Sequence, residues 1–193
     1  MSIVSSLPDK LKENNVAFDI SDKSHVVKTL GVRWLPVDDC FIFTVEHCNF
    51  ELGKTMTKRQ MLSDISKVFD PLGWLVPVTL KLKLYMQASW LQSQEWDAPL
   101  PDDIVASFRS WRTTLPLLKS IKIPRFVGSK IIQLHVFCDA SQLSYASCIY
   151  ARSVNKGVVT VSLLVAKSKV APIKQLSIPR VELCGMLLGS VLV

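Results

Sequence analysis

Two carboxylates in the last third of the chain have the chemistry of a catalytic or metal-binding pair. Asp139 directly follows the apolar run 134–138, and Glu182 lies early in an amphipathic stretch that begins at Pro179. Carboxylate oxygens are ligands that Mg²⁺ prefers, and two such ions can activate water for phosphodiester cleavage. Each residue also has an ordinary explanation, as a turn residue and as a Glu favoured by a helix dipole.

The elements around this pair must be strands followed by a helix. Three β-rich runs with short links predict an antiparallel meander, and Pro179 is suited to the first turn of a helix. If that helix packs across the sheet, the two carboxylates meet at the end of the first strand. The predicted strands are 131–138, 146–152 and 158–166, and a basic loop, 167–177, precedes the helix.

The preceding half of the chain predicts a β-hairpin and three helices. The hairpin combines the β-branched and aromatic runs 26–34 and 40–45. Thr57 and Gln60 form a capping box for the first helix, and a second helix is expected over 77–94 with the apolar stripe Leu80, Leu84, Ala88 and Leu91. The third helix has Asp102 as its expected cap and the stripe Ile104, Phe108, Trp111, Leu115 and Leu118. The predicted fold class is therefore α+β.

The positive charge of the 193 residues is concentrated after residue 53. The formal net charge is +7, with a net of −3 over 1–53 and +10 over 54–193. Such an excess favours an anionic partner, with nucleic acid first, although a solvated basic surface is equally common. The candidate phosphate contacts are Lys54, Lys58, Arg59, Lys81, Lys83, Lys167, Lys169, Lys174 and Arg180.

The sequence predicts an intracellular protein with no membrane partner. It has neither the pattern of a signal peptide nor a run of about 20 apolar residues. Its five cysteines are odd in number, widely spaced and without a C-x-x-C motif, which indicates free thiols rather than a disulfide framework or a zinc site.

Several motifs occur in a specific order between about Lys28 and the C-terminus. They are Leu30-Gly31-Val32-Arg33-Trp34, Asp70-Pro71-Leu72-Gly73, Gln87-Ala88-Ser89-Trp90, Phe137-Cys138-Asp139-Ala140-Ser141, the stretch 164–172, and Ile178-Pro179-Arg180-Val181-Glu182-Leu183-Cys184. Together these motifs resemble the pol polyprotein of BEL/Pao-type LTR retrotransposons.

The resemblance implies three segments and a nucleic-acid function. Residues 1–25 are expected to be weakly structured, 26–123 to resemble a reverse-transcriptase thumb and connection, and 124–193 to be a truncated ribonuclease H-like domain. The implied partners are template–primer duplex or RNA–DNA hybrid and the rest of the polyprotein. Asp139 and Glu182 would be the first two carboxylates of a Mg²⁺-dependent site. The third would lie beyond Val193, so the fragment is expected to be catalytically incomplete.

Two other functions remain open from the sequence. The Pao region also bears the name of a retrotransposon peptidase, which implies an aspartic protease with one Asp from each of two chains. Here the turn is Asp139-Ala140-Ser141, without the Gly of an Asp-Ser/Thr-Gly motif. The third possibility is a structural remnant without activity.

Overall fold

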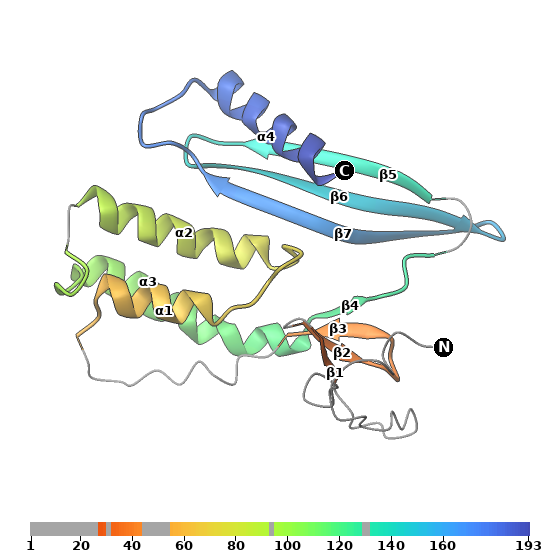
Figure 1. Cartoon of the computed structure of the whole chain (residues 1–193), viewed down its shortest axis with the longest axis horizontal. Helices are drawn as coiled ribbons and strands as arrows, with labels where there is room; N and C mark the ends of the chain where they lie inside the picture. The colour runs from red at the N-terminus through yellow and green to blue at the C-terminus, as the bar shows by residue number, and fades with distance from the viewer. Residues whose placement is uncertain (1–26, 30–31, 44–54, 93–94, 129–131) are drawn as a thin grey trace, which may run out of the picture.

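The computed structural model describes residues 27–29, 32–43, 55–92, 95–128 and 132–193. The predicted segment 1–25 and Lys54 lie outside these ranges. Two antiparallel sheets and a group of helices make up the described chain (Figure 1), which confirms the α+β class. The elements are β1 Val27–Thr29, β2 Val32–Leu35, β3 Cys40–Ile42, α1 Lys58–Ser66, α2 Val76–Leu91, α3 Asp102–Thr114, η3 Leu115–Ser120, β4 Lys122–Pro124, β5 Ile132–Ala140, β6 Ser144–Asn155, β7 Val158–Val170 and α4 Ile178–Leu192.

The first sheet corrects the predicted hairpin and adds a strand, β4. The run 26–34, predicted as a single strand, forms two strands, β1 and β2, which pair with each other, and only β2 pairs with β3. The order of the sheet is β1-β2-β3-β4, and the β2–β3 turn contains Asp39, at φ 46°, which accepts a hydrogen bond from the Trp34 indole. The additional strand, β4, pairs with β3 through Phe41 and Ile123. A three-residue strand that ends in Pro has too little alternation to be recognised. The predicted boundary after residue 123 falls inside it.

The structure confirms the predicted N-terminal cap of the first helix and corrects that of the third. The Thr57–Gln60 capping box is present at α1. The prediction that Asp102 caps α3 is wrong, because Pro101 is the N-cap and Asp102 is the first helical residue, without a side-chain cap. Its carboxylate still lies in the first turn, where the helix dipole favours a negative charge. All five residues of the predicted α3 stripe are buried.

Helix α2 buries a different face from the one predicted. Its fully buried side chains are Leu82, Met86 and Ser89, whereas Leu91 of the predicted stripe is 59% exposed. The helix contacts α1 and α3 on one side and β7 on the other, as Figure 1 shows. A helix covered on two sides carries apolar residues over most of its circumference, so no single stripe marks its buried face.

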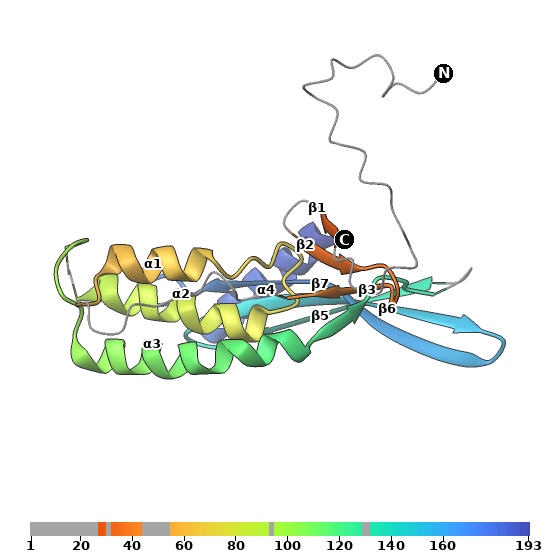
Figure 2. The same cartoon turned by 90° about the horizontal axis from the view of Figure 1, so that it is seen from below.

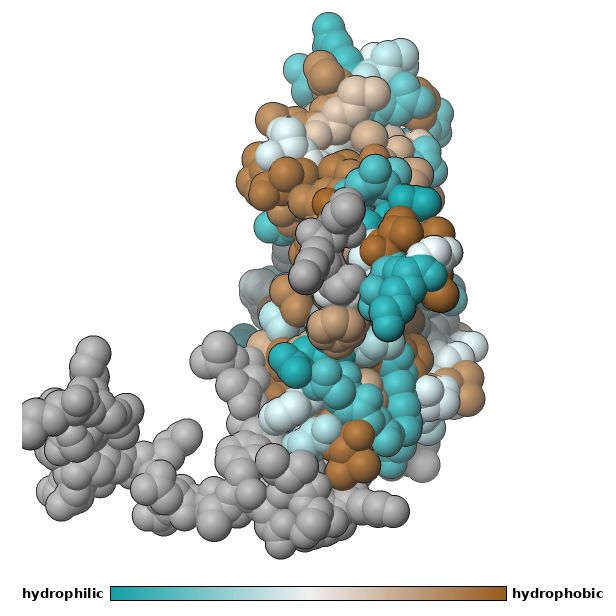
Figure 3. Space-filling view, turned by 90° about the vertical axis from the view of Figure 1, so that its right-hand side faces the viewer, coloured by the Kyte–Doolittle hydropathy of each residue, from teal (hydrophilic) through white to brown (hydrophobic). Residues whose placement is uncertain are grey.

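The second sheet is the predicted meander, in the order β5-β6-β7. The predicted basic loop 167–177 is wrong in its first part, because β7 continues to Val170 and includes Lys167 and Lys169. The Lys156–Gly157 turn joins its two longest strands with positive φ at both residues, and the resulting hairpin extends away from the helices (Figures 1 and 2). Seen from this end, apolar patches interrupt the hydrophilic surface (Figure 3). Exposed apolar side chains of the meander include Ile132, Val158, Val159 and Val161.

Helix α4 covers one face of the meander and leaves the other face partly uncovered. A Cβ placed on Gly185 would lie 3.6 Å from the Cys138 Cβ, and one on Gly189 would lie 2.7 Å from the Ser147 Oγ. Because side chains alternate along a strand, the neighbours of these residues point the opposite way. We call that side the open face. Its side chains include His135, Phe137 and Asp139 from β5 and Cys148, Tyr150 and Arg152 from β6.

Candidate functional site

Asp139 lies at the end of β5, where a tight turn follows the strand. It is paired in register with Ala146 and is exposed. Its Oδ1 accepts a hydrogen bond of 2.8 Å from the backbone N–H of Ala140. The turn is held by the Ser141 hydroxyl, which accepts hydrogen bonds from the N–H groups of Leu143 and Ser144, each at 3.2 Å. The turn therefore fixes the end of the strand and leaves the second carboxylate oxygen accessible.

Glu182 lies on α4 shortly before the helix crosses the end of β5. The helix is held on the sheet by buried Val181, and Glu182 beside it is exposed. One turn further on, a Cβ on Gly185 would lie 3.5 Å from the carbonyl oxygen of Asp139. This contact places the first turns of α4 at the same end of β5 as Asp139.

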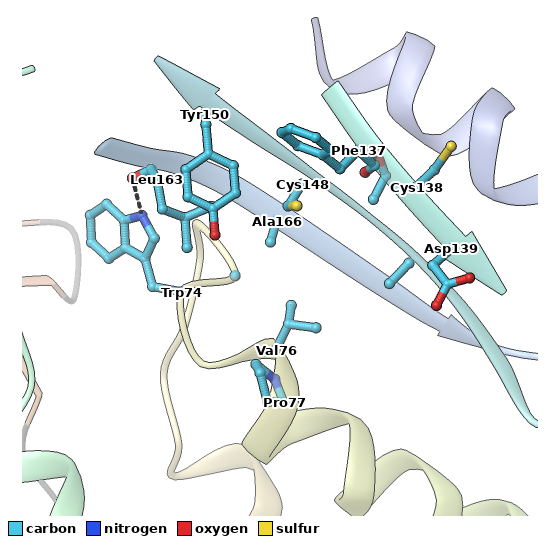
Figure 4. A pocket seen from close by; sticks show the side chains of 13 residues that line it. Trp74, Val76, Pro77, Phe137, Cys138, Asp139, Cys148, Tyr150, Leu163 and Ala166 are labelled. Carbon is cyan, nitrogen blue, oxygen red and sulfur yellow. Dashed lines mark hydrogen bonds between the residues drawn. The ribbon is translucent and has the colours of Figure 1, made fainter. Parts of the chain in front are cut away.

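The two carboxylates approach this end of β5 from opposite faces. Figure 4 shows Cys138 directed toward α4 and Asp139 directed away from it. They can meet only around the outer edge of β5, which pairs with no strand in the part of the chain that the structure describes. As hard oxygen donors both residues fit Mg²⁺. The same described residues contain no group of three His, Cys, Asp or Glu that could hold a metal ion.

Part of the predicted basic set gathers beside α4. Lys167 is in register with Ser147 and Lys169 with Tyr145, so both project on the face that α4 covers. Lys174 is in the loop between β7 and α4, and Arg180 is on the helix itself. All four side chains are exposed. We call Lys167, Lys169, Lys174 and Arg180 the basic surface.

The other predicted cations lie among the helices and differ from one another. Lys58 is only 4% exposed. Arg59 forms an ion pair with Asp97 at 2.8 Å, which raises the pKa of the arginine. Lys83 donates hydrogen bonds to the carbonyl and hydroxyl of Ser168 at 2.9 and 3.2 Å, and burial lowers its pKa. Lys83 is therefore next to the basic surface, because Ser168 lies between Lys167 and Lys169 in β7 and the charge of Lys167 also lowers the pKa of Lys83. Lys81 is exposed on α2.

A pocket of about 300 Å³ on the open face was not predicted from the sequence. Trp74 lines it and is fixed by its indole N–H, which donates to the carbonyl oxygens of Leu163 and Leu164 at 3.2 and 3.0 Å. Cys148 also lines it, and burial raises the pKa of this thiol. No sequence pattern marks this pocket, because its walls come from segments about 60 residues apart. They include Gly73, Trp74, Val76, Pro77, Phe137, Asp139, Cys148, Tyr150 and Leu163.

Comparison with known proteins agrees with this architecture. A family model described as a Pao retrotransposon-like RNaseH-like domain matches residues 57–193, which include helices α1 to α4 and the meander. No curated protein matches the chain. The family description gives no support to the peptidase alternative. In the described ranges, no helix is both long and apolar enough to span a bilayer. The chain belongs to the Pao retrotransposon-like RNaseH-like domain family.

Proposed function

We propose that this chain is the part of a retrotransposon pol polyprotein that binds an RNA–DNA hybrid, with the basic surface in contact with the phosphates. The observation that carries the proposal is the position of Asp139 and Glu182 near one end of β5, in a meander whose α4-covered face also carries Lys167, within a chain segment of an RNaseH-like family. Phosphate contacts supply most of the sequence-independent affinity of such proteins.

The two carboxylates are proposed to hold a divalent cation near the bound backbone. A divalent ion there would supply a nucleophilic water and stabilise charge on the leaving oxygen. The chain's own contribution is to position two carboxylates, and the Ala140 N–H orients one oxygen of Asp139. Because the described residues contain no group of three metal ligands, we propose that this chain binds the hybrid without cleaving it at a measurable rate.

The test is binding of a fluorescein-labelled RNA–DNA hybrid, measured by fluorescence anisotropy at salt concentrations between 50 and 300 mM. For binding through phosphate contacts, the logarithm of the affinity falls linearly with the logarithm of the salt concentration. The proposal predicts salt-dependent binding and a smaller slope for the double variant Lys167→Gln/Lys169→Gln. Each lost phosphate contact lowers the slope by about 0.9 for a B-form duplex, so the double variant should lose about 1 to 2.

A matched control replaces exposed lysines away from α4. Lys119 is in the last turn of η3 and Lys156 lies in the β6–β7 turn, and both are exposed. The double variant Lys119→Gln/Lys156→Gln removes the same net charge and should keep more of the wild-type slope. Equal slopes for the two double variants would contradict the proposal, as would affinity that does not change with salt.

A further inference from the structure

The open face has a groove that shares only Asp139 with the proposed hybrid site. Beside the pocket at Trp74 lies a second pocket of about 380 Å³, lined by His135, Arg152 and Val161. Phe137 and Tyr150 line both pockets, so the two pockets are neighbours on this face, and we call them together the groove. The basic surface lies on the other face of the same sheet.

Aromatic rings form the floor of this groove. Phe137 and Tyr150 are adjacent, with ring centroids 5.9 Å apart and planes at 79°. Phe137 lies on the edge strand β5 and is 57% exposed, so its ring is accessible from solvent. Figure 4 shows both rings above the sheet, with Trp74 at the other side of the pocket. Exposed rings on a rigid sheet are suited to stacking against planar groups.

Arg152 provides a candidate phosphate contact at one end of the groove. Arg152 lies beside the rings and uses one guanidinium nitrogen to donate to Gln133 at 2.9 Å, so further N–H groups remain for a phosphate. Asp139, at the opposite end of the groove, is the acidic residue among those that line the two pockets. Stacking rings beside an arginine, in a chain with net charge +7, are the features of a surface for single-stranded nucleic acid.

We propose that the open face binds single-stranded RNA or DNA, with a base stacked on the Phe137–Tyr150 pair and the backbone passing Arg152. This site is on the opposite face of the meander from the basic surface and does not depend on hybrid binding there. Its recognition is by stacking, which tolerates any base, so the expected preference is for unpaired over duplex nucleic acid.

The test is anisotropy of a labelled oligouridylate 12-mer, a single strand without internal pairing, with the full chain. Phe137→Leu removes the ring and keeps an apolar side chain on the strand. Stacking of one base is worth about 1–3 kcal/mol, so Phe137→Leu is expected to weaken binding by about fivefold or more. Tyr150→Leu and Arg152→Gln should also weaken it. The matched control is Phe126→Leu, since Phe126 is a comparably exposed phenylalanine (65%) outside the groove.

Circular dichroism and urea midpoints identify variants that fold as the wild type does, and only these are compared. Folded Phe137→Leu with wild-type affinity for the oligouridylate would overturn the proposal, as would equal losses for Phe137→Leu and Phe126→Leu. A sedimentation experiment could also overturn the proposal. It would do so if the protein were a dimer that Phe137→Leu dissociates and that the oligouridylate does not, because the groove would then be the contact between two copies of the chain. Loss of hybrid binding in the Lys167→Gln/Lys169→Gln variant leaves this inference untouched, so the two proposals fail separately.

Discussion

Gly73 lies directly against the backbone of Ala166, and a Cβ at Gly73 would come within 1.7 Å of the Ala166 carbonyl oxygen. The contact is continued by a hydrogen bond of 2.8 Å from the Ala166 N–H to the Leu72 carbonyl. The loop before α2 therefore occupies the outer edge of β7 and joins the helices to the meander. This contact between the loop and β7 lies within the residues that the family model matches. It joins the two segments that the sequence predicted as separate domains.

Gly73→Ala is expected to destabilise the protein by at least about 2 kcal/mol. The residue has φ +73°, where a Cβ is strained, and the backbone of β7 leaves no space for it. The measurement is the free energy of unfolding in urea. Gly157→Ala is the control, because Gly157 has φ +81° with no atom within 4 Å of its added Cβ. Equal losses for the two variants would mean that the β7 contact contributes nothing.

Trp74→Phe is expected to cost about 1–2 kcal/mol of unfolding free energy. The substitution keeps an aromatic ring that can stack on Phe41, as the indole does with ring centroids 5.1 Å apart. It removes the N–H that donates hydrogen bonds to two carbonyl oxygens of β7. Trp90→Phe is the control, because Trp90 is 53% exposed on α2, and such surface changes stay within about 0.5 kcal/mol. Similar urea midpoints for both variants would refute this role of the indole.

Two glycines of α4 should respond to alanine with opposite signs. Gly185→Ala places its Cβ at ordinary contact distances of 3.5–3.6 Å, so the helix propensity of Ala should raise stability by up to about 1 kcal/mol. Gly189→Ala meets the Ser147 Oγ at 2.7 Å and Val136 at 2.9 Å. It should lower the melting temperature, because the Ser147 hydroxyl must leave its 3.0 Å bond to the Phe137 carbonyl. A gain at Gly189 would show that α4 can move away from the sheet.

Asp70 should make the protein less stable as pH rises through the acidic range. Burial raises the pKa of its carboxyl above the ordinary value of 3.8. Hydrogen bonds from backbone N–H groups, including that of Leu75 at 2.8 Å, lower the pKa but by less than burial raises it. The folded state then holds the proton more tightly than the unfolded state. This contribution to stability is present below pH 3.8 and is lost as pH rises through the raised pKa.

The corresponding experiment compares wild type with Asp70→Asn in urea at a series of pH values. The stability of wild type relative to the variant should fall between pH 3 and neutrality, because only the wild type titrates at this position. A relative stability that instead rises with pH would mean that the folded chain favours the ionised carboxylate, and that its pKa is lowered.

The sequence predicted elements with strong local signals and missed those that depend on distant contacts. The Thr57 capping box and the α3 stripe are properties of neighbouring residues, and both are present. The burial of α2 against β7 and the pairing of β4 with β3 depend on segments far apart in the chain. Local patterns contain no information on such pairs.

The candidate site shows the same division. Asp139 and Glu182 could be singled out by residue type and position, and their approach to one end of β5 follows from the packing of Gly185. That the two carboxylates lie on opposite faces of the sheet could not be predicted, because it depends on the strand register and on which face of the sheet α4 covers. The groove at Phe137 and Tyr150 was missed because exposed aromatic residues in a strand look the same in sequence as buried ones.

Asp139 and Glu182 are proposed to bind one cation, although they reach the end of β5 from opposite faces. Manganese substitutes for magnesium at oxygen ligands and broadens the NMR signals of nearby nuclei, so it can be titrated into ¹⁵N-labelled protein. If the two carboxylates share one ion, the amide signals of Ala140 and Leu183 broaden together, and either Asp139→Asn or Glu182→Gln reduces the broadening at both. Broadening at one of these amides that is unaffected by the substitution at the other carboxylate would contradict this proposal.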